Sequence, residues 1–363
     1  MPDTEPTTAH PVIVDAHLDA AYNAVVLGRD LARTVAELRD EEQRTPPPEA
    51  SAGIPMVSWP TLIEGRTAVI GGSIFVAPAV KSHPKATDTY RTPDEAHRQG
   101  IAQLDYYRRI SDERQDVQLL TDEAGLDEVL ASWDTEAPSV GVFVVMEGAE
   151  PILAPKELPW WVERGLRGVG LAWAAGTRYA GGNGNPGPLT DEGKALVDAM
   201  SDYNLMLDIS HLWEEAALTV LDRYPGPIVA THGNPRAFVN TPRQLSDEMI
   251  RYVAEREGVV GVVAYNRFLD AGWHPGRLRV PLSRLVEAID HICQITGHAA
   301  SVGLGSDFDG GFGQDSVPAE LDSAADLYKI GDQLRARGYT ASDTEAILSG
   351  NWLRVMRSVL AAF

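Results

Sequence analysis

The chain has 363 residues, and its formal net charge of -21 at pH 7 argues against nucleic acid or an anionic membrane surface as a partner. The single cysteine, Cys293, excludes an intramolecular disulfide bond, and no run of about 18 apolar residues is present that could cross a bilayer. The N-terminal sequence MPDTEPTTAHP lacks the basic and apolar regions of a signal peptide, so we expect a cytoplasmic protein.

Short apolar runs alternate with helical patterns along the chain. Near-continuous apolar runs are typical of parallel strands that are buried on both faces. The predicted strands cover residues 12–17, 67–77, 139–147, 167–173, 204–210, 227–232, 258–265 and 301–307. Helical patterns lie between several of them, for example over residues 190–203 and 283–296.

This alternation predicts an α/β fold, a (β/α)8 barrel of the TIM type. An open, doubly wound sheet is the alternative, but no G-x-G-x-x-G motif follows the first strand to support a dinucleotide-binding version. We expect a single barrel domain over residues 1–363, with long βα loops at about 28–66 and 176–188. A closing amphipathic helix is expected over residues 343–360.

Side chains that can bind a metal stand where the predicted strands end. Each one alone is more often a hydrogen-bonded structural residue, but burying six titratable groups at one rim without a counter-ion would be costly. Three carboxylates and three imidazoles are what two divalent cations need when one carboxylate is shared. The sequence therefore predicts a metal site formed by His17, Asp19, Glu147, His211, His232 and Asp307.

The same residues lie in motifs that resemble those of a known family. The segments VDAHLD, EGAE, DISH, THGNPRAFVNTPRQLSDEMI, GLGSDFDG and LSGNWLRV follow one another between residues 12 and 360. Together they resemble the membrane (renal) dipeptidase family, peptidase family M19, within the amidohydrolase-like superfamily. The resemblance implies a barrel with the architecture of metal-dependent hydrolases.

The resemblance also implies two Zn²⁺ ions per chain, bridged by Glu147 and by a water or hydroxide. The first ion would be held by His17, Asp19 and Glu147. The second ion would be completed by His211 and His232. Because the same nitrogen and oxygen donors also hold Co, Mn or Fe, the residues alone do not decide which metal is bound.

The function that the resemblance implies is hydrolysis of the amide bond of a dipeptide by the metal-bridging hydroxide. Asp307, close to the first ion, would act as general base and then as general acid. Arg243 would bind the terminal carboxylate of the substrate, with Arg236 as a competitor for that role, and Tyr265 would contact the substrate. The partner is thus a small molecule, and a homodimer is compatible with the family.

The fourth predicted strand departs from the family pattern. Trp173 stands where the family typically has a histidine that contacts the scissile carbonyl, and an indole cannot accept a proton. Arg178 is a candidate to replace the lost donor. The departure at Trp173 leaves a first alternative, a metal-dependent hydrolase of another amide, an N-acyl amino acid or a lactone. A second alternative, a non-catalytic ligand-binding barrel, is disfavoured because the ligand set is intact.

Overall fold

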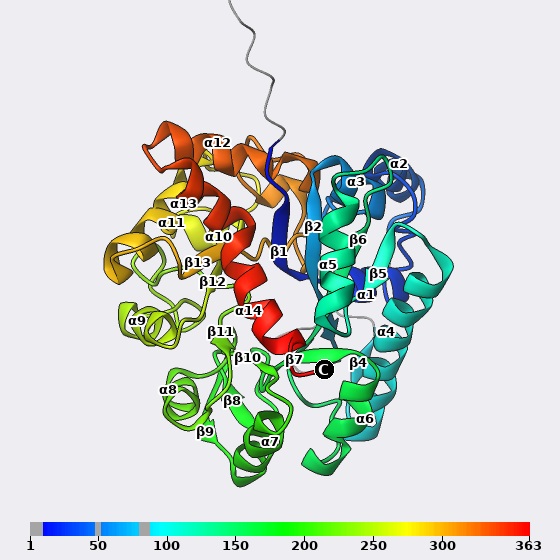
Figure 1. Cartoon of the computed structure of the whole chain (residues 1–363), viewed down its shortest axis with the longest axis vertical. Coiled ribbons are helices and arrows are strands. Elements are labelled where there is room, and N and C mark those ends of the chain that lie inside the picture. The colour runs from blue at the N-terminus through cyan, green and yellow to red at the C-terminus, as the bar shows by residue number, and fades with distance from the viewer. Residues whose placement is uncertain (1–9, 48–51, 80–87) are drawn as a thin grey trace, which may run out of the picture.

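Eight parallel strands form a barrel at the centre of the computed structural model, which describes residues 10–47, 52–79 and 88–363 (Figure 1). The barrel strands follow one another around the ring in chain order: β1 (Ile13–Leu18), β2 (Thr67–Phe75), β6 (Val140–Glu147), β7 (Leu166–Gly170), β10 (Met206–Asp208), β11 (Ile228–Val229), β12 (Val260–Val262) and β13 (Val302–Leu304).

Hydrogen bonds close the ring between β1 and β13 and between β11 and β12. Strand β1 pairs in parallel with β13, with Asp15 opposite Leu304. Strands β11 and β12 are joined by a parallel bridge between Ala230 and Val260. A further short strand, β5 (Val117–Leu119), pairs with the beginning of β6. The predicted α/β barrel fold is therefore confirmed.

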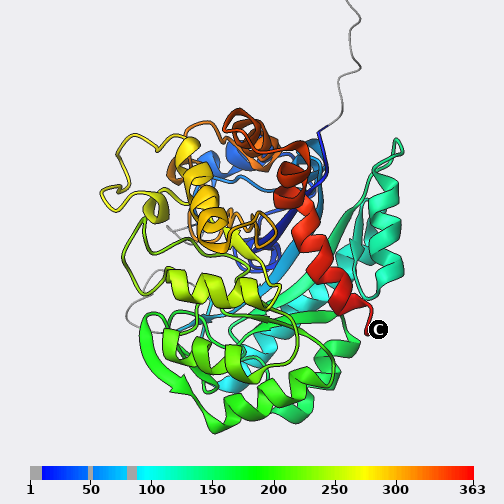
Figure 2. The same cartoon turned by 60° about the vertical axis from the view of Figure 1, so that its left-hand side comes forward.

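Helices surround the strands (Figures 1 and 2). In Figure 1, α8, α9 and α11 lie to the left of the barrel and α4, α5 and α6 to the right. The helices are α1 (Ala20–Val25), α2 (Val35–Arg44), α3 (Trp59–Glu64), α4 (Pro93–Glu113), α5 (Glu123–Ser132), α6 (Leu158–Glu163), α7 (Asp191–Ser201), α8 (Glu214–Arg223), α9 (Asp247–Glu255), α10 (Asn266–Leu269), α11 (Ser283–Thr296), α12 (Tyr328–Ala336), α13 (Ala341–Glu345) and α14 (Asn351–Leu360).

The helical patterns at 190–203 and 283–296 correspond to α7 and α11. The predicted strands, in contrast, extend past the observed ones, most clearly at β10, β11 and β13. The ladder becomes incomplete there because some backbone N–H groups beyond these strands bond to side chains rather than to a neighbouring strand. Ser210 N, for example, donates to Asp208 Oδ1 at 3.0 Å, and Ser306 N donates to Asp15 Oδ1 at 2.8 Å.

The long connection between β1 and β2 contains α1, α2 and α3, and its residues 48–51 lie outside the described residues. Helix α2 begins with a capping box, in which Thr34 and Glu37 bond to each other's backbone N–H groups. The Gly-rich segment 176–188 contains an antiparallel hairpin, β8 (Ala180–Gly182) and β9 (Asn185–Leu189). A short parallel pair, β3 (Ala77–Pro78) with β4 (Thr89–Tyr90), follows β2.

The C-terminal segment covers the end of the barrel where the strands begin. A π-helical turn at Ala346–Gly350 joins α13 to α14, which crosses the middle of the view in Figure 1. Helix α14 contacts β1 and β10, which lie on opposite sides of the ring. Its fully buried Trp352 packs against Gly303 of β13. The other end of the barrel is left for the loops that follow the strands.

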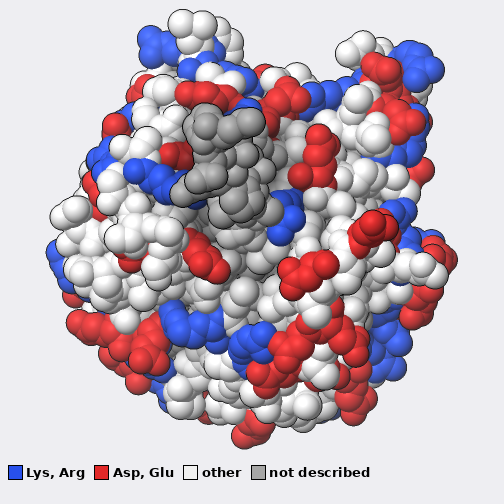
Figure 3. All heavy atoms as spheres, turned by 45° about the horizontal axis from the view of Figure 1, so that its top comes forward, with Lys and Arg blue, Asp and Glu red and all other residues white. Residues whose placement is uncertain are grey.

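The surface carries charges of both signs. Figure 3 shows Asp and Glu side chains interspersed with Lys and Arg over the visible face. Among the described residues, no helix combines the length and the apolar character needed to cross a membrane.

Candidate metal centre

The structure brings the six candidate ligands together at the ends of the barrel strands, around the carboxylate of Glu147. Glu147 is the last residue of β6, and its Oε2 lies 3.4 Å from His17 Nε2. Its Oε1 lies 3.0 Å from His211 Nε2 and 3.4 Å from His232 Nε2. The Oδ1 atom of Asp19 lies 3.8 Å from His17 Nε2. One carboxylate thus faces three imidazoles in a buried setting.

Three groups of donor atoms, each with all atoms within 4.8 Å of one another, can be formed from these residues. The first contains His17, Asp19 and Glu147, and the second contains Glu147, His211 and His232. The first two groups share Glu147. In the third group Asp307 joins His17 and His232.

The histidines present the same nitrogen to this centre. His211 Nδ1 lies 3.0 Å from Asn183 Oδ1, and the Nδ1 atoms of His17 and His232 both lie near Thr231 Oγ1. Their Nε2 atoms are left facing the carboxylates. His17 Nε2 is buried and has no hydrogen-bond partner among the described residues, as expected for a nitrogen that binds a metal.

The charges of the site favour a cation at its centre. Burial and the charge of the nearby Arg243 together lower the pKa of His211 to about 4. Burial also opposes protonation of His17, but Glu147 and Asp19 outweigh it and raise the pKa of this imidazole to about 10. Burial and the charge of Glu147 raise the pKa of Asp19 to about 6. Negative groups are therefore in excess around His17, which a metal ion would neutralise.

Asp307 is held at the rim in a left-handed backbone conformation, with φ of 59°. Its N–H donates to His17 O at 3.2 Å. A Cβ atom at position 310 would lie 2.1 Å from Asp307 Oδ1, so only glycine leaves room for this carboxylate. Burial raises the pKa of Asp307 well above its usual range.

A cavity of about 230 Å³ opens onto the cluster. Arg243, Tyr265 and Trp173, the predicted substrate contacts, all line it. The guanidinium of Arg243 is fixed by the carbonyl oxygens of Ser210 (3.0 Å) and His232 (3.1 Å). Further aromatic side chains complete the wall: Tyr22, Phe75, Phe268 and Phe312.

The aromatic side chains form two sets on the cavity wall. Phe75 contacts both Tyr22 and Trp173, with ring centroids 5.3 and 5.2 Å apart. Tyr265 stacks on Phe312 at 4.2 Å. Arg243 lies over the ring of Phe268, which also contacts Tyr265. The guanidinium of Arg243 therefore packs against the second set, which consists of Tyr265, Phe268 and Phe312.

Two other arginines that the sequence suggested for the site do not line this cavity. Arg236, the competitor of Arg243, pairs with Glu214 at 2.9 Å and is absent from the described lining of the cavity. Arg178 does not line it either, because it pairs with Glu150 at 2.9 Å and donates to Leu153 O at 3.0 Å. The suggestion that Arg178 replaces the missing histidine is therefore wrong.

The β8–β9 hairpin contacts both the Trp173 segment of the cavity wall and His211, one of the candidate ligands. Asn183 N donates to His211 O at 2.9 Å, while its side chain bonds to His211 Nδ1. A Cβ atom at Gly182 would lie 2.0 Å from Trp173 O, so the hairpin backbone packs directly on the Trp173 segment. Asn183 was not predicted, although its place in a Gly-rich loop after a barrel strand was a signal for a functional role.

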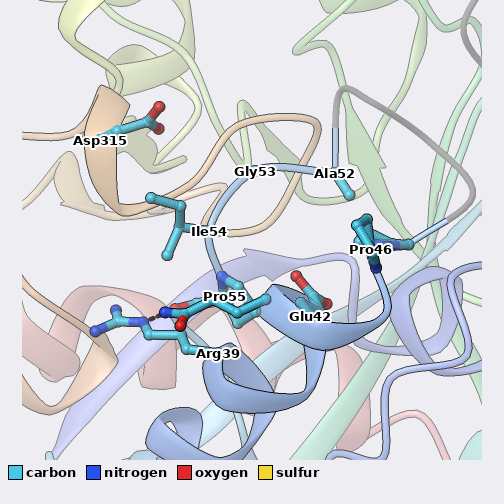
Figure 4. A pocket seen from close by; sticks show the side chains of 10 residues that line it. Arg39, Glu42, Pro46, Ala52, Gly53, Ile54, Pro55 and Asp315 are labelled. Atoms are coloured by element: carbon cyan, nitrogen blue, oxygen red, sulfur yellow. Dashed lines mark hydrogen bonds between the residues drawn. The ribbon is translucent and has the colours of Figure 1, made fainter.

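A second cavity, about 450 Å³, lies between α2 and the segment around Asp315 (Figure 4). The residues that line it include Arg39, Glu42, Ile54 and Pro55. None of the six clustered side chains lines it. We therefore place the candidate chemistry in the smaller cavity.

Comparison with known proteins gives the same family along almost the whole chain. The family model described as membrane dipeptidase (peptidase family M19) matches residues 4–362. The chain is 35% identical over 214 residues to an uncharacterized protein from the pqqA 5′ region of Klebsiella pneumoniae, covering 56% of this chain and 76% of that protein. It is 27% identical over 303 residues to an uncharacterized dipeptidase of Schizosaccharomyces pombe, covering 81% and 71%.

Solved structures share the fold. A metallopeptidase from Rhodobacter sphaeroides, liganded with a phosphinate mimic of the dipeptide L-Ala-D-Ala, superposes with a TM-score of 0.79 at 22% identity, covering 96% of this chain and 99% of that one. A probable dipeptidase from Pseudomonas aeruginosa gives a TM-score of 0.80 at 19% identity, covering 97% and 96%. With the family matched from end to end and a buried His, Glu and Asp cluster at the rim of its barrel, the chain belongs to the membrane dipeptidase family, M19, a family of metallopeptidases that hydrolyse peptide bonds.

Proposed function

We propose that this protein is a binuclear zinc dipeptidase whose clustered side chains hold two Zn²⁺ ions. The observation that carries the proposal is the sharing of Glu147 by two donor groups beside a cavity that contains Arg243. Histidine and carboxylate donors suit zinc, and zinc bound there would activate water and polarise the scissile carbonyl. His17 and Asp19 would complete one site, and His211 and His232 the other.

The cavity suggests how a dipeptide would lie. Arg243 has both Nη atoms anchored on backbone carbonyls, and its remaining N–H groups would bind the terminal carboxylate of the substrate. Tyr265 and Trp173 would contact apolar parts of the substrate and exclude water. The ligand of the Rhodobacter sphaeroides relative mimics L-Ala-D-Ala, and a dipeptide with small side chains is our proposal for a cavity of about 230 Å³.

Asp307 would move the proton in this reaction. Its carboxylate would accept a proton from the attacking water and return it to the departing amine nitrogen. A pKa raised by burial supports this role, because the carboxyl group can hold the proton between the two steps. Glu147 would remain ionised, because burial is outweighed by His17 and by its hydrogen bonds with His211 and His232, which keep its pKa well below the usual range.

The proposal is tested by measuring the metal content of the protein and its hydrolysis of a library of L-L and L-D dipeptides. We expect two zinc ions per chain and turnover of dipeptides, with activity lost on chelation and restored by added zinc. A chain that takes up no metal would contradict the proposal. Two bound metals without dipeptide turnover would favour a different substrate.

Replacing the cation of the cavity should weaken recognition of the substrate carboxylate. For Arg243→Ala we expect a higher KM and a kcat/KM lower by about 10- to 100-fold, the range of one charged hydrogen bond. Metal content should stay at the parental value. Steady-state kinetics on a dipeptide and on its C-terminal amide measure the effect.

The amide provides the internal control, because it lacks the carboxylate. The parent should prefer the dipeptide over the amide, and Arg243→Ala should lose that preference. Arg236→Ala is the matched variant, since Arg236 lies on the same connection but pairs with Glu214. Equal losses in the two variants would show that Arg243 is not specific for the carboxylate.

Removing the ionisable group at position 307 should stop proton transfer. In Asp307→Asn we expect kcat to fall by about 10²- to 10⁴-fold, the usual contribution of general acid–base catalysis. Most of the zinc should remain, since both groups that share Glu147 are intact. Asp315→Asn, which changes an exposed carboxylate on the following segment, should keep the parental kcat. Near-parental turnover by Asp307→Asn would rule out the acid–base role.

A second candidate function is supported by Trp173. Its ring lies 5.2 Å from Phe75 and 6.0 Å from His211, on the cavity wall where the family typically has a histidine. An indole cannot accept a proton, and it narrows the space beside the cluster. Hydrolysis of another amide, an N-acyl amino acid or a lactone would then be the main activity.

The two candidates predict different outcomes for Trp173→His. If Trp173 directs the site away from dipeptides, the variant should raise dipeptide kcat/KM by about 10²-fold, the scale of one hydrogen-bond donor to the oxyanion. Trp173→Phe should give no such gain, because it supplies no imidazole. If the parent already hydrolyses dipeptides well and Trp173→His brings no improvement, the second candidate is excluded.

A further inference from the structure

We propose that Thr231 is a positioning residue whose hydroxyl group orients one histidine of each proposed zinc site. Its Oγ1 lies 2.9 Å from His232 Nδ1 and 3.3 Å from His17 Nδ1. Thr231 is fully buried, directly before His232. This inference rests on the proposed function, because it assumes that both histidines bind metal through Nε2.

The hydrogen bonds around this hydroxyl group can be assigned from their partners. Oγ1 also lies 2.5 Å from Asp208 Oδ2. A carboxylate offers only acceptors, so the single hydrogen of the Thr231 hydroxyl is donated to Asp208. The two lone pairs of Oγ1 remain, and they accept the Nδ1–H groups of His232 and His17. All hydrogen-bonding capacity of the hydroxyl group is then used.

The assignment fixes which nitrogen of each ring is free. A neutral imidazole whose Nδ1 carries the hydrogen keeps its lone pair on Nε2, and that nitrogen is the one that can bind a metal. The Nε2 atoms of His17 and His232 each lie 3.4 Å from an oxygen of Glu147. The two rings are stacked with centroids 3.7 Å apart. One hydroxyl group therefore holds two rings as a pair.

The carboxylate that directs the hydroxyl group is itself fixed. Asp208 is the last residue of β10, and its Oδ1 accepts from Ser210 N at 3.0 Å and from Thr231 N at 2.9 Å. Ser210 Oγ donates to the same oxygen at 2.5 Å. Asp208 is almost fully buried, so these bonds leave it little freedom to move. The orientation of both histidines is thus set from the end of the neighbouring strand.

His211 is oriented independently. Its Nδ1 bonds to Asn183 Oδ1 in the β8–β9 hairpin. Removing the Thr231 hydroxyl group should therefore weaken both zinc sites, whereas removing the Asn183 side chain should weaken only the site that contains His211. This difference separates orientation of specific ligands from a general loss of stability.

Thr231→Val tests the inference, because it removes the hydroxyl group and nearly keeps the shape of the side chain. The affinities of both zinc equivalents, measured against a chelating dye, should fall by about 10- to 100-fold, as for other partners of metal-binding histidines. Thr231→Ser should restore the parental affinities. Asn183→Ala should weaken one equivalent only. If Thr231→Val does not fold, the smaller Thr231→Ala serves, with the same expectation.

Thr67→Val is the matched control. Thr67 is fully buried at the start of β2, and its hydroxyl group has no hydrogen-bond partner among the described residues. We expect its zinc affinities to equal those of the parent. The ¹⁵N resonances of labelled histidines in metal-free protein give a second measurement. The Nδ1–H signals of His17 and His232 should change in Thr231→Val, whereas that of His211, which bonds to Asn183, should not.

The results distinguish this inference from the proposed function. A parent that binds two zinc ions, with unchanged affinities and histidine spectra in Thr231→Val, would overturn the inference alone. A parent that binds no zinc, but whose His17 and His232 Nδ1–H signals depend on Thr231, would overturn the proposed function and leave the orientation by Thr231 standing.

Discussion

The burial of Glu147 is the constraint on which the rest of the site depends. An ionised carboxylate in a closed barrel is unfavourable by several kcal/mol unless cations or hydrogen-bond donors surround it. The partners are His17 in β1, His211 three residues beyond β10 and His232 three residues beyond β11, and the closed ring brings them to one point. The order of the strands therefore also determines the electrostatics of the site, because it places three imidazoles around the carboxylate of Glu147.

The strands and the candidate ligands could be predicted from the sequence because both are local signals. Apolar runs mark strands; Glu147 is the last residue of a strand, and His17 and His232 lie within three residues of a strand end. Parallel strands of a barrel bring such ends to one face. The exact strand ends could not be predicted, because buried carboxylates such as Asp208 accept hydrogen bonds from backbone N–H groups that would otherwise continue the ladder.

What could not be predicted are contacts between segments far apart in the chain. Thr231 and Asp208 meet because β10 and β11 pair with Asp208 opposite Val229, and the sequence does not state this register. The aromatic wall combines Phe75 with Phe312, which no local pattern connects. Arg178 illustrates the opposite error: its position after a strand suggested a role in the cavity, but the nearby Glu150 binds it instead.

The β8–β9 hairpin makes two properties of the protein inseparable. Its Gly182 backbone rests on the carbonyl of Trp173, and Asn183 holds His211 by two hydrogen bonds. Any evolutionary change that shifts the hairpin to admit a larger substrate also moves His211, a member of the candidate metal centre. Substrate preference would then change slowly in evolution, because a substitution that alters the shape of the cavity would be retained only if the imidazole of His211 keeps its position.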